Sequence, residues 1–147
     1  MRISGLQKMT LLDYPGKIAC TVFLGGCNFR CPFCHNGELL DGAVAPVMEV
    51  AEFLAFLSKR KGLLDAVCVS GGEPTLQPGL AGLLEKIKKM GYSVKLDTNG
   101  SRPEILKDLV ARGLLDYVAM DIKNAPQHYE QTAGAAVQME RIEESIR

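Results

Sequence analysis

The sequence predicts an α/β fold in which helices cover a largely parallel sheet. Short segments rich in apolar and β-branched residues alternate with segments whose apolar residues recur at helical spacing, and glycines bound the short connections between them. Each parallel pair of strands needs such a crossover, so the alternation favours a parallel sheet. The 147 residues are expected to form one domain, residues 1–147, that buries roughly 70% of the surface of the unfolded chain.

The first βα unit begins with a buried strand over residues 17–24. The turn-forming DYPG at positions 13–16 could pair this strand with residues 2–9. A cysteine-rich loop follows the strand directly. Apolar residues at positions 50, 53, 54 and 57 then follow the i, i+3, i+4, i+7 spacing of an amphipathic helix, which is expected to end near Gly62.

The same pattern repeats along the chain. Residues 65–69 form a second strand, and apolar side chains at positions 80, 83, 84 and 87 form a helical stripe that ends before Gly91. Residues 92–97 are expected to be the third strand. The polar motifs follow the strands, which places them at the carboxyl ends, where α/β folds build their sites.

A capping box is predicted at the start of the next helix. Ser101 and Glu104 have the spacing of such a box for a helix over residues 102–112. Residues 116–121 form the fourth strand, and the tail has apolar residues at positions 139, 142 and 146 on helical spacing. No fifth parallel strand can be read after it.

Composition excludes several classes of partner. Seventeen basic residues balance seventeen acidic ones without a basic run, so neither a nucleic-acid partner nor a membrane-surface partner is expected. No apolar run approaches the ~20 residues of a membrane span. Five cysteines without a leader segment do not resemble a secreted disulfide framework, so a reducing cytoplasm is the expected location.

Three cysteines within eight residues, at positions 27–34, predict a metal centre. A 4Fe-4S cluster normally takes four thiolates, so a loop with three leaves one iron open for other chemistry. The alternative is a zinc site that His35 or a remote residue would complete, although zinc motifs usually come as two separated ligand pairs. The expected ligands are Cys27, Cys31 and Cys34.

The remaining cysteines and histidines are expected to have other roles. Cys20 and Cys68 lie inside apolar strands and are predicted to be small buried hydrophobes. His35 could donate a hydrogen bond to the cluster or lie in solvent, and His128 is expected at the surface.

The cysteine loop, with Phe33 before its last cysteine, resembles the signature of the radical S-adenosylmethionine (SAM) enzymes. SGGEP at positions 70–74 is similar to the second motif of that family. DTNG at 97–100 and DIK at 121–123 resemble later motifs of its glycyl-radical enzyme activating members. The resemblance extends to about Gly134 and implies a partial (β/α) barrel of the radical SAM type.

The family barrel has six βα units, whereas about four can be read here, so the C-terminal strands are apparently missing. The outer edge of residues 116–121 is then expected to be covered by the N-terminal segment, by the tail or by another chain.

The resemblance also implies an activity. SAM would chelate the open iron through its amino and carboxylate groups, and one electron would cleave it to methionine and a 5′-deoxyadenosyl radical. LLDYPG at 11–16 and GCNFRCPFCHN at 26–36 are most similar to activating proteins of anaerobic ribonucleoside-triphosphate reductase. The implied partners are that glycyl-radical protein and a flavodoxin-type or ferredoxin-type reductant, in an anaerobic setting. The alternatives are an activase of the pyruvate formate-lyase type and a non-catalytic metal-binding module.

SAM contacts are expected from backbone and side chains. The two glycines at 71 and 72 would let N–H groups approach the cofactor, and Glu73 would meet its ammonium group or else only complement a helix dipole. No residue is predicted to be catalytic in its own right. The expected cofactor-binding residues are Gly71, Gly72, Glu73, Asp97, Asn99 and Lys123.

A monovalent cation beside SAM is a further expectation from the resemblance. Asp97, Thr98 and Asp121 end two adjacent strands, and their oxygens could converge with a backbone carbonyl near Ala119. Alternatively, both aspartates cap the turns that follow them. Lys123 could contact SAM or pair with an aspartate.

Overall fold

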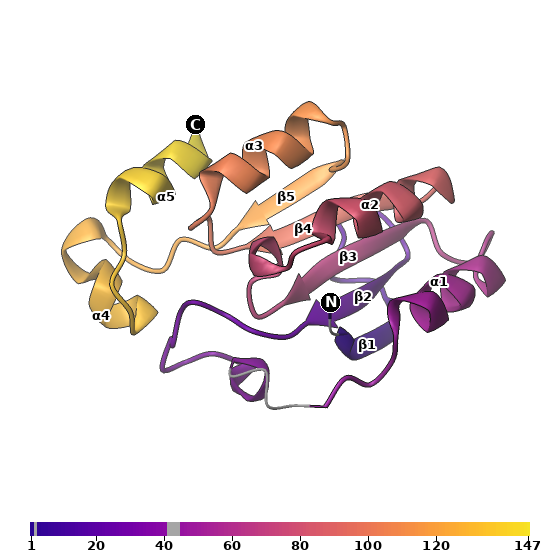
Figure 1. The fold of residues 1–147 in the computed structure, drawn as a ribbon, viewed down its shortest axis with the longest axis horizontal. Coiled ribbons are helices and arrows are strands. Elements are labelled where there is room, and N and C mark those ends of the chain that lie inside the picture. The colour runs from indigo at the N-terminus through magenta and orange to yellow at the C-terminus, as the bar shows by residue number, and fades with distance from the viewer. Residues whose placement is uncertain (2, 41–44) are drawn as a thin grey trace.

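The computed structural model describes residues 1, 3–40 and 45–147, and it has a single five-stranded sheet (Figure 1). The strand order is β1-β2-β3-β4-β5, with β2 to β5 parallel and β1 antiparallel to β2. The predicted parallel sheet and the pairing of the first strand are therefore confirmed. The strands are β1 (Ile3–Thr10), β2 (Ala19–Leu24), β3 (Ala66–Gly71), β4 (Ser93–Thr98) and β5 (Tyr117–Met120).

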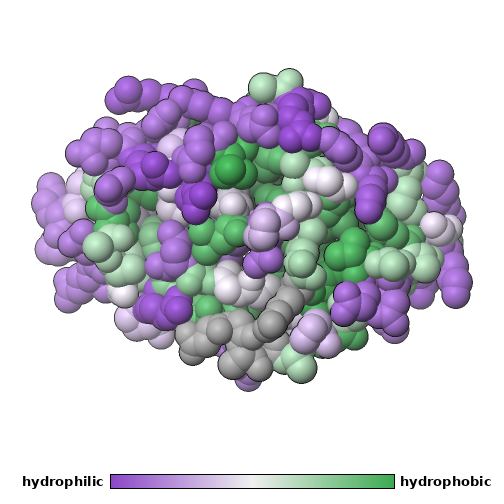
Figure 2. Space-filling model, viewed as in Figure 1, coloured by the Kyte–Doolittle hydropathy of each residue, from purple (hydrophilic) through white to green (hydrophobic). Residues whose placement is uncertain are grey.

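Three helices cover one face of the sheet, and two more lie beyond β5 in the chain (Figure 1). The covering helices are α1 (Val50–Lys59), α2 (Leu80–Lys89) and α3 (Pro103–Ala111), and the tail forms α4 (Tyr129–Ala133) and α5 (Met139–Ile146). Single 3-10 turns occur at η1 (Gly37–Leu39), η2 (Pro74–Leu76) and η3 (Pro126–His128). On the side seen in Figure 2, hydrophilic residues dominate the rim and hydrophobic ones gather toward the middle.

Alternation along the strands gives the sheet two different faces. Val22, Val69 and Leu96 are fully buried in the core against α1, α2 and α3. The intervening residues point to the opposite face, where Thr21 of β2 pairs in register with Cys68 of β3 and Cys68 with Lys95 of β4. This second face is polar near its middle.

The turn between β1 and β2 folds over this polar face. Tyr14 is buried there with Ala19 and Ala66, and its ring centroid lies 5.8 Å from that of Tyr117. The Thr21 hydroxyl donates a 2.5 Å hydrogen bond to a carboxylate oxygen of the same turn. The turn therefore closes the end of the sheet opposite the carboxyl ends of the parallel strands.

The predicted capping box of α3 is wrong. Arg102, not Ser101, is the N-cap, and its guanidinium has no acceptor that could cap the helix N–H groups. Glu104 instead pairs with Arg102 and Arg141. A capping box does occur at α1, between the N-cap glutamate and the residue three positions later.

The outer edge of β5 pairs with none of the strands described. The N-terminal strand lies at the opposite edge of the sheet, and residues 126–146 form a 3-10 turn and helices, so neither adds a strand beside β5. Which of the three expected covers occupies this edge stays a prediction, and Tyr14 of the N-terminal segment already contacts Tyr117 of β5. Among the described residues, none of the helices combines the length and apolar character needed to cross a membrane.

Candidate functional site

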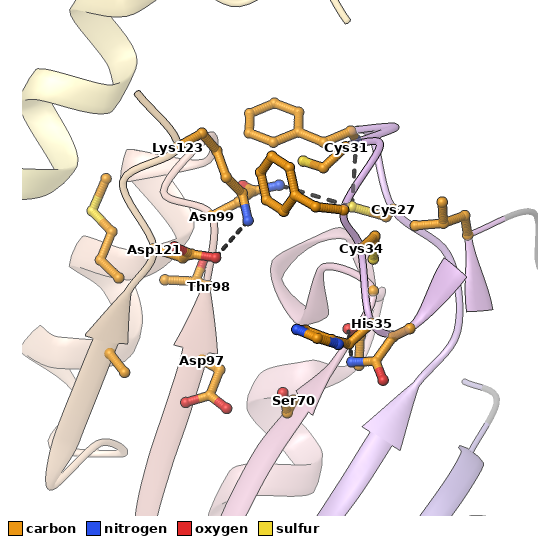
Figure 3. Close-up of a pocket in the computed structure, with 18 residues that line it drawn as sticks. Cys27, Cys31, Cys34, His35, Ser70, Asp97, Thr98, Asn99, Asp121 and Lys123 are labelled. Carbon is orange, nitrogen blue, oxygen red and sulfur yellow. Dashed lines mark hydrogen bonds and ion pairs between the residues drawn. The ribbon is translucent and has the colours of Figure 1, made fainter. Parts of the chain in front are cut away.

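A pocket of about 460 Å³ opens at the carboxyl ends of the parallel strands (Figure 3). That volume lies within the roughly 300–1,000 Å³ typical of small-molecule sites. The cysteine loop forms one wall, and the ends of β3, β4 and β5 form the others. The prediction that the motifs meet at this end of the sheet is confirmed.

All three loop cysteines line this pocket, as Figure 3 shows. Cys31 is buried, while Cys27 and Cys34 are half-buried. Backbone hydrogen bonds hold the loop: the Cys34 N–H donates to the Cys31 carbonyl at 3.1 Å, and the Phe29 N–H donates to the Cys27 sulfur at 3.3 Å. Burial raises the pKa of Cys27 and of Cys31, and the neighbouring thiols raise both further.

The three thiols lie in one pocket wall, as a cluster with one cysteine per iron requires. Within residues 1, 3–40 and 45–147, no three Cys, His, Asp or Glu side chains are placed to hold one metal ion. A cluster binds each thiolate at a different iron, whereas tetrahedral zinc draws all its ligands to one point. A bound cluster would also offset the mutual repulsion of three neighbouring thiolates.

The tail of the chain supports the cysteine loop from outside. Phe29 and Cys31 pack with Tyr129, Ala133 and Ile142 in a small cluster that is separate from the main core. We call these five residues the loop clamp. The sequence predicted an apolar stripe that includes Ile142 but not that it packs on the cysteine loop, and the glycine at position 134 that ends α4 was a further signal.

The two glycines after β3 allow backbone segments to touch. A Cβ atom on Gly71 would lie 2.2 Å from the carbonyl oxygen of Leu24, and one on Gly72 would lie 2.1 Å from that of Gly26. The Gly72 N–H donates to Leu24 at 2.9 Å, so it is not directed at a cofactor as expected. Both glycines still line the pocket.

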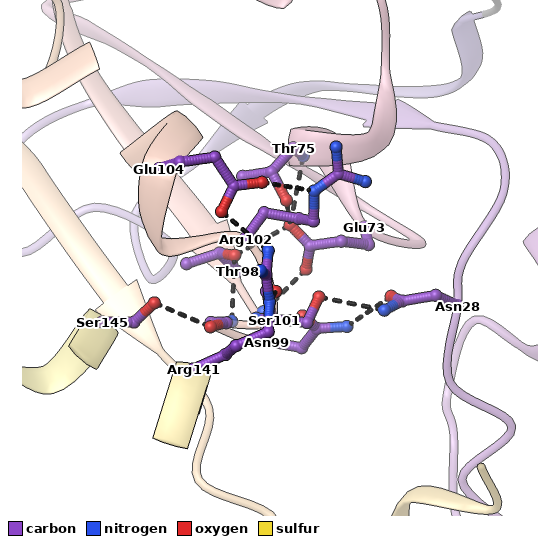
Figure 4. A network of polar contacts seen from close by, with 11 residues as sticks. Asn28, Glu73, Thr75, Thr98, Asn99, Ser101, Arg102, Glu104, Arg141 and Ser145 are labelled. Atoms are coloured by element: carbon purple, nitrogen blue, oxygen red, sulfur yellow. Dashed lines mark hydrogen bonds and ion pairs between the residues drawn. The ribbon is translucent and has the colours of Figure 1, made fainter. Parts of the chain in front are cut away.

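Glu73 lies beneath the pocket and does not line it (Figure 4). Its carboxylate is fully buried and accepts hydrogen bonds from the backbone and hydroxyl of Thr75, from the Thr98 hydroxyl at 2.8 Å, and from the Asn99 N–H at 2.7 Å. Four donors occupy the carboxylate, so this geometry does not support the expected contact with the ammonium group of SAM. Glu73 instead ties the turn after β3 to the end of β4.

Asn99 connects this buried network to the cysteine loop. Its side-chain amide donates to Asn28 at 3.0 Å and lies 4.0 Å from the Cys27 sulfur, and its amide oxygen accepts from the Ser101 N–H at 3.0 Å. Asn28 also donates to the Ser101 hydroxyl. Asn99 therefore reaches the pocket as predicted, while the contribution of Asn28 and Ser101 could not be inferred from sequence.

The residues expected to hold a monovalent cation each have a protein partner in the structure. Asp97 forms an ion pair with Lys95 at 2.6 Å, and Asp121 forms one with Lys123 at 2.5 Å. The Thr98 hydroxyl donates to Glu73, as described above. Asp97, Thr98 and Asp121 all line the pocket, but each is already engaged elsewhere.

Lys123 brings a positive charge to the cysteine wall. Burial lowers its pKa, but the hydrogen bond and charge of Asp121, with the nearby Cys31 and Cys27, outweigh that effect and raise it. Its ammonium lies 5.9 Å from the centre of the Phe33 ring. Of the two roles expected for Lys123, the ion pair with an aspartate is therefore present.

Cys20 packs in the apolar core as predicted, whereas Cys68 is buried on the polar face and donates to Asp97 at 3.4 Å, so its role as a plain hydrophobe is wrong. Cys20 and Cys68 are fully buried, and burial raises the pKa of each to about 12, so they stay protonated. His35 lines the pocket and is exposed, and His128 lies at the surface.

Comparisons with known proteins agree with this geometry. The sequence profile described as the radical SAM superfamily matches residues 21–147. A protein of Methanocaldococcus jannaschii, named as a candidate glycyl-radical enzyme activating enzyme, is 35% identical over 98% of this chain and 59% of its own length. The pyruvate formate-lyase-activating enzyme of Clostridium pasteurianum is 36% identical over 84% of this chain and 52% of its own. The chain thus spans about half to three-fifths of the length of these curated relatives.

Two solved structures share the fold. QueE from Escherichia coli has a TM-score of 0.55 at 21% identity, covering 67% of this chain and 52% of its own. TYW1 with a lysine-pyruvate adduct has a TM-score of 0.52 at 20% identity, covering 88% of this chain and 48% of its own. The expected radical SAM type of α/β fold is confirmed.

Proposed function

The chain belongs to the radical SAM superfamily. We propose that it acts as a glycyl-radical activating enzyme, which abstracts a hydrogen atom from a backbone glycine of a partner protein. The family implies a 4Fe-4S cluster and SAM as cofactors. Bound together and given one electron by the reductant, they would supply the 5′-deoxyadenosyl group that accepts the hydrogen atom, with release of methionine.

One observation carries the proposal most directly. Cys27, Cys31 and Cys34 face the same pocket as the ends of β3, β4 and β5, and the protein provides only three thiols there. The other two cysteines are fully buried, one of them against the covering helices. An iron without a protein ligand would therefore face the pocket, whose volume of about 460 Å³ is in the range of small-molecule sites.

The other wall of the pocket offers groups that orient a polar cofactor. Lys123 would lie beside the carboxylate of SAM, and the Asn99 side chain is within reach of the cluster wall. Glu73 would act from below, because its hydrogen bonds fix Asn99 and Thr98 where they meet the pocket. These residues orient the cofactor and exclude water from it. None of them exchanges a proton in the proposed step.

We propose anaerobic ribonucleoside-triphosphate reductase as the partner, with a flavodoxin-type or ferredoxin-type reductant. The support is the sequence similarity of residues 11–16 and 26–36 to activating proteins of that reductase. The relatives at 35% and 36% identity support a glycyl-radical protein in general, including one of the pyruvate formate-lyase type.

Anaerobic reconstitution tests the proposal. We expect about four irons and four sulfides per chain, SAM-dependent formation of 5′-deoxyadenosine, and a glycyl radical detected by electron paramagnetic resonance when the correct partner is added. Anaerobic ribonucleotide reductase and pyruvate formate-lyase should be compared side by side, with Cys31→Ala as the inactive control. A full cluster without any cleavage of SAM would favour the metal-binding module instead.

A further inference from the structure

We propose that Lys95 is a built-in counter-ion for Asp97, which makes the cofactor pocket independent of a monovalent cation. This inference rests on the proposed function, because it concerns the pocket in which SAM would bind. It assigns Lys95 as a positioning residue, which acts on the cofactor through the Asp97 carboxylate.

The position of Lys95 places its charge directly under the pocket. Lys95 and Asp97 are two residues apart on β4 and so point to the same face of the sheet, and Asp97 lines the pocket while Lys95 lies one layer deeper. The Lys95 ammonium is 2.6 Å from one Asp97 carboxylate oxygen and 3.8 Å from the Cys68 sulfur. Cys68 is 3.4 Å from the other Asp97 oxygen.

Among the described residues, the Asp97 oxygen beside Lys95 accepts no hydrogen bond, so the ammonium 2.6 Å away is what balances its charge. One oxygen takes the ammonium and the other takes the thiol of Cys68, which stays protonated. A cation added at this point would be repelled by an ammonium already in contact with the same carboxylate. Thr98 brings no negative charge that could offset this repulsion, because it is a neutral hydroxyl that donates to Glu73.

Lys95 also cannot easily swing away to admit an ion. Its side chain is only 11% exposed, and the residues paired with it in register are Cys68 on one side and Tyr117 on the other. Tyr14 and the turn around it cover the same face. Moving the ammonium away would require displacing the side chains packed around it. The ion pair is therefore a fixed part of the layer beneath the pocket.

Two measurements on the reconstituted protein test the inference. The first is the SAM dissociation constant at constant ionic strength in tetramethylammonium, Na⁺ or K⁺ chloride. For the natural chain we expect it to vary by less than about twofold. The second is ²³Na relaxation, titrated with Na⁺ and competed with K⁺, for which we expect no saturable site in the natural chain.

Substitution should create the cation dependence. Lys95→Met leaves Asp97 without a partner, so we expect a saturable Na⁺ site that Asp97→Asn removes in the double variant. SAM affinity of Lys95→Met should be at least about tenfold weaker in tetramethylammonium than in K⁺. Lys95→Arg, which keeps the charge, should behave as the natural chain does. Lys107→Met removes an equally paired but exposed lysine and is the matched control.

Each remaining outcome is decisive. Saturable Na⁺ binding by the natural chain that Asp97→Asn abolishes, or SAM binding at least about tenfold tighter in K⁺, would overturn the inference. So would a Lys95→Met protein that folds but gains no Na⁺ site. If Lys95→Met does not fold, the natural-chain measurements decide alone. Failure to bind or cleave SAM in any salt would count against the proposed function. The ²³Na relaxation measurement would still test whether Lys95 keeps a cation from binding at Asp97.

Discussion

A Cβ atom on Gly134 would lie 2.3 Å from the carbonyl oxygen of Arg30, so the end of α4 and the cysteine loop meet backbone to backbone. The Arg30 N–H also donates a 2.7 Å hydrogen bond to the carbonyl of Ala133. No side chain larger than hydrogen fits between these segments. The loop that carries the thiols is therefore supported by a part of the chain far from it in sequence.

Gly134→Ala should destabilise the protein by more than backbone strain alone, because it also disrupts this contact. Gly134 has a φ of 62° and Gly113 a φ of 65°, so alanine at either position is strained by about 1–2 kcal/mol. A Cβ on Gly113 meets nothing within 4 Å, which makes Gly113→Ala the matched control. We expect Gly134→Ala to lower the thermal midpoint clearly more and to reduce iron uptake on reconstitution. Equal midpoints and equal iron in both variants would show that the contact is unimportant.

Removing any loop thiol should abolish the cluster. Cys27→Ala, Cys31→Ala and Cys34→Ala are each expected to lose iron and the visible absorbance of the cluster, because only these thiols face the pocket. Cys20→Ala should retain full iron content and lose only about 1 kcal/mol of stability, since it deletes one buried sulfur. Full iron in Cys31→Ala would disprove the ligand assignment.

Glu73→Gln should mainly lower the free energy of unfolding. The amide presents an N–H₂ group to donors that now meet a carboxylate oxygen, so we expect a loss of about 2–4 kcal/mol. Urea unfolding of the metal-free protein measures this loss, with the half-exposed Glu104→Gln as control. A change in SAM affinity without a change in stability would instead restore the direct contact that the sequence suggested.

Gly82→Ala should stabilise the protein. Gly82 lies within α2, and a Cβ there would meet nothing within 4 Å. Alanine in a helix interior is favoured over glycine by about 0.8–1 kcal/mol. Urea unfolding should show a higher midpoint with an unchanged slope, and iron content should not change. A lower midpoint would mean that the helix surface at this position makes contacts that the structure does not show.

The order of the βα units could be predicted because each depends on local periodicity. The third strand, expected at residues 92–97, is β4 at Ser93–Thr98, and the helix after it is one residue shorter than expected at each end. Pro103 explains the shift at the start of that helix, since its ring fixes the first helical position. Local rules thus located the strands to within about two residues, whereas α4 was not predicted.

The contacts within the site could not be predicted in the same way. The direction of the Glu73 side chain depends on Thr98 and Asn99, which lie about 25 positions later in the chain. The ion pair of Lys95 depends on which strand face is covered, and the loop clamp depends on how the tail packs. Motif resemblance identified the chemistry, whereas only the folded chain shows which donors and acceptors are already satisfied.

The loop clamp also has a consequence for how the protein matures. Cys31 and Ala133 are 102 positions apart, so the loop lacks the support of the clamp until α4 has been made. At a synthesis rate of about 5–20 residues per second, this leaves an interval on the order of 5–20 s. Iron and sulfide delivered during that interval would meet an open loop. Delivered later, they must reach the thiols through the mouth of the finished pocket.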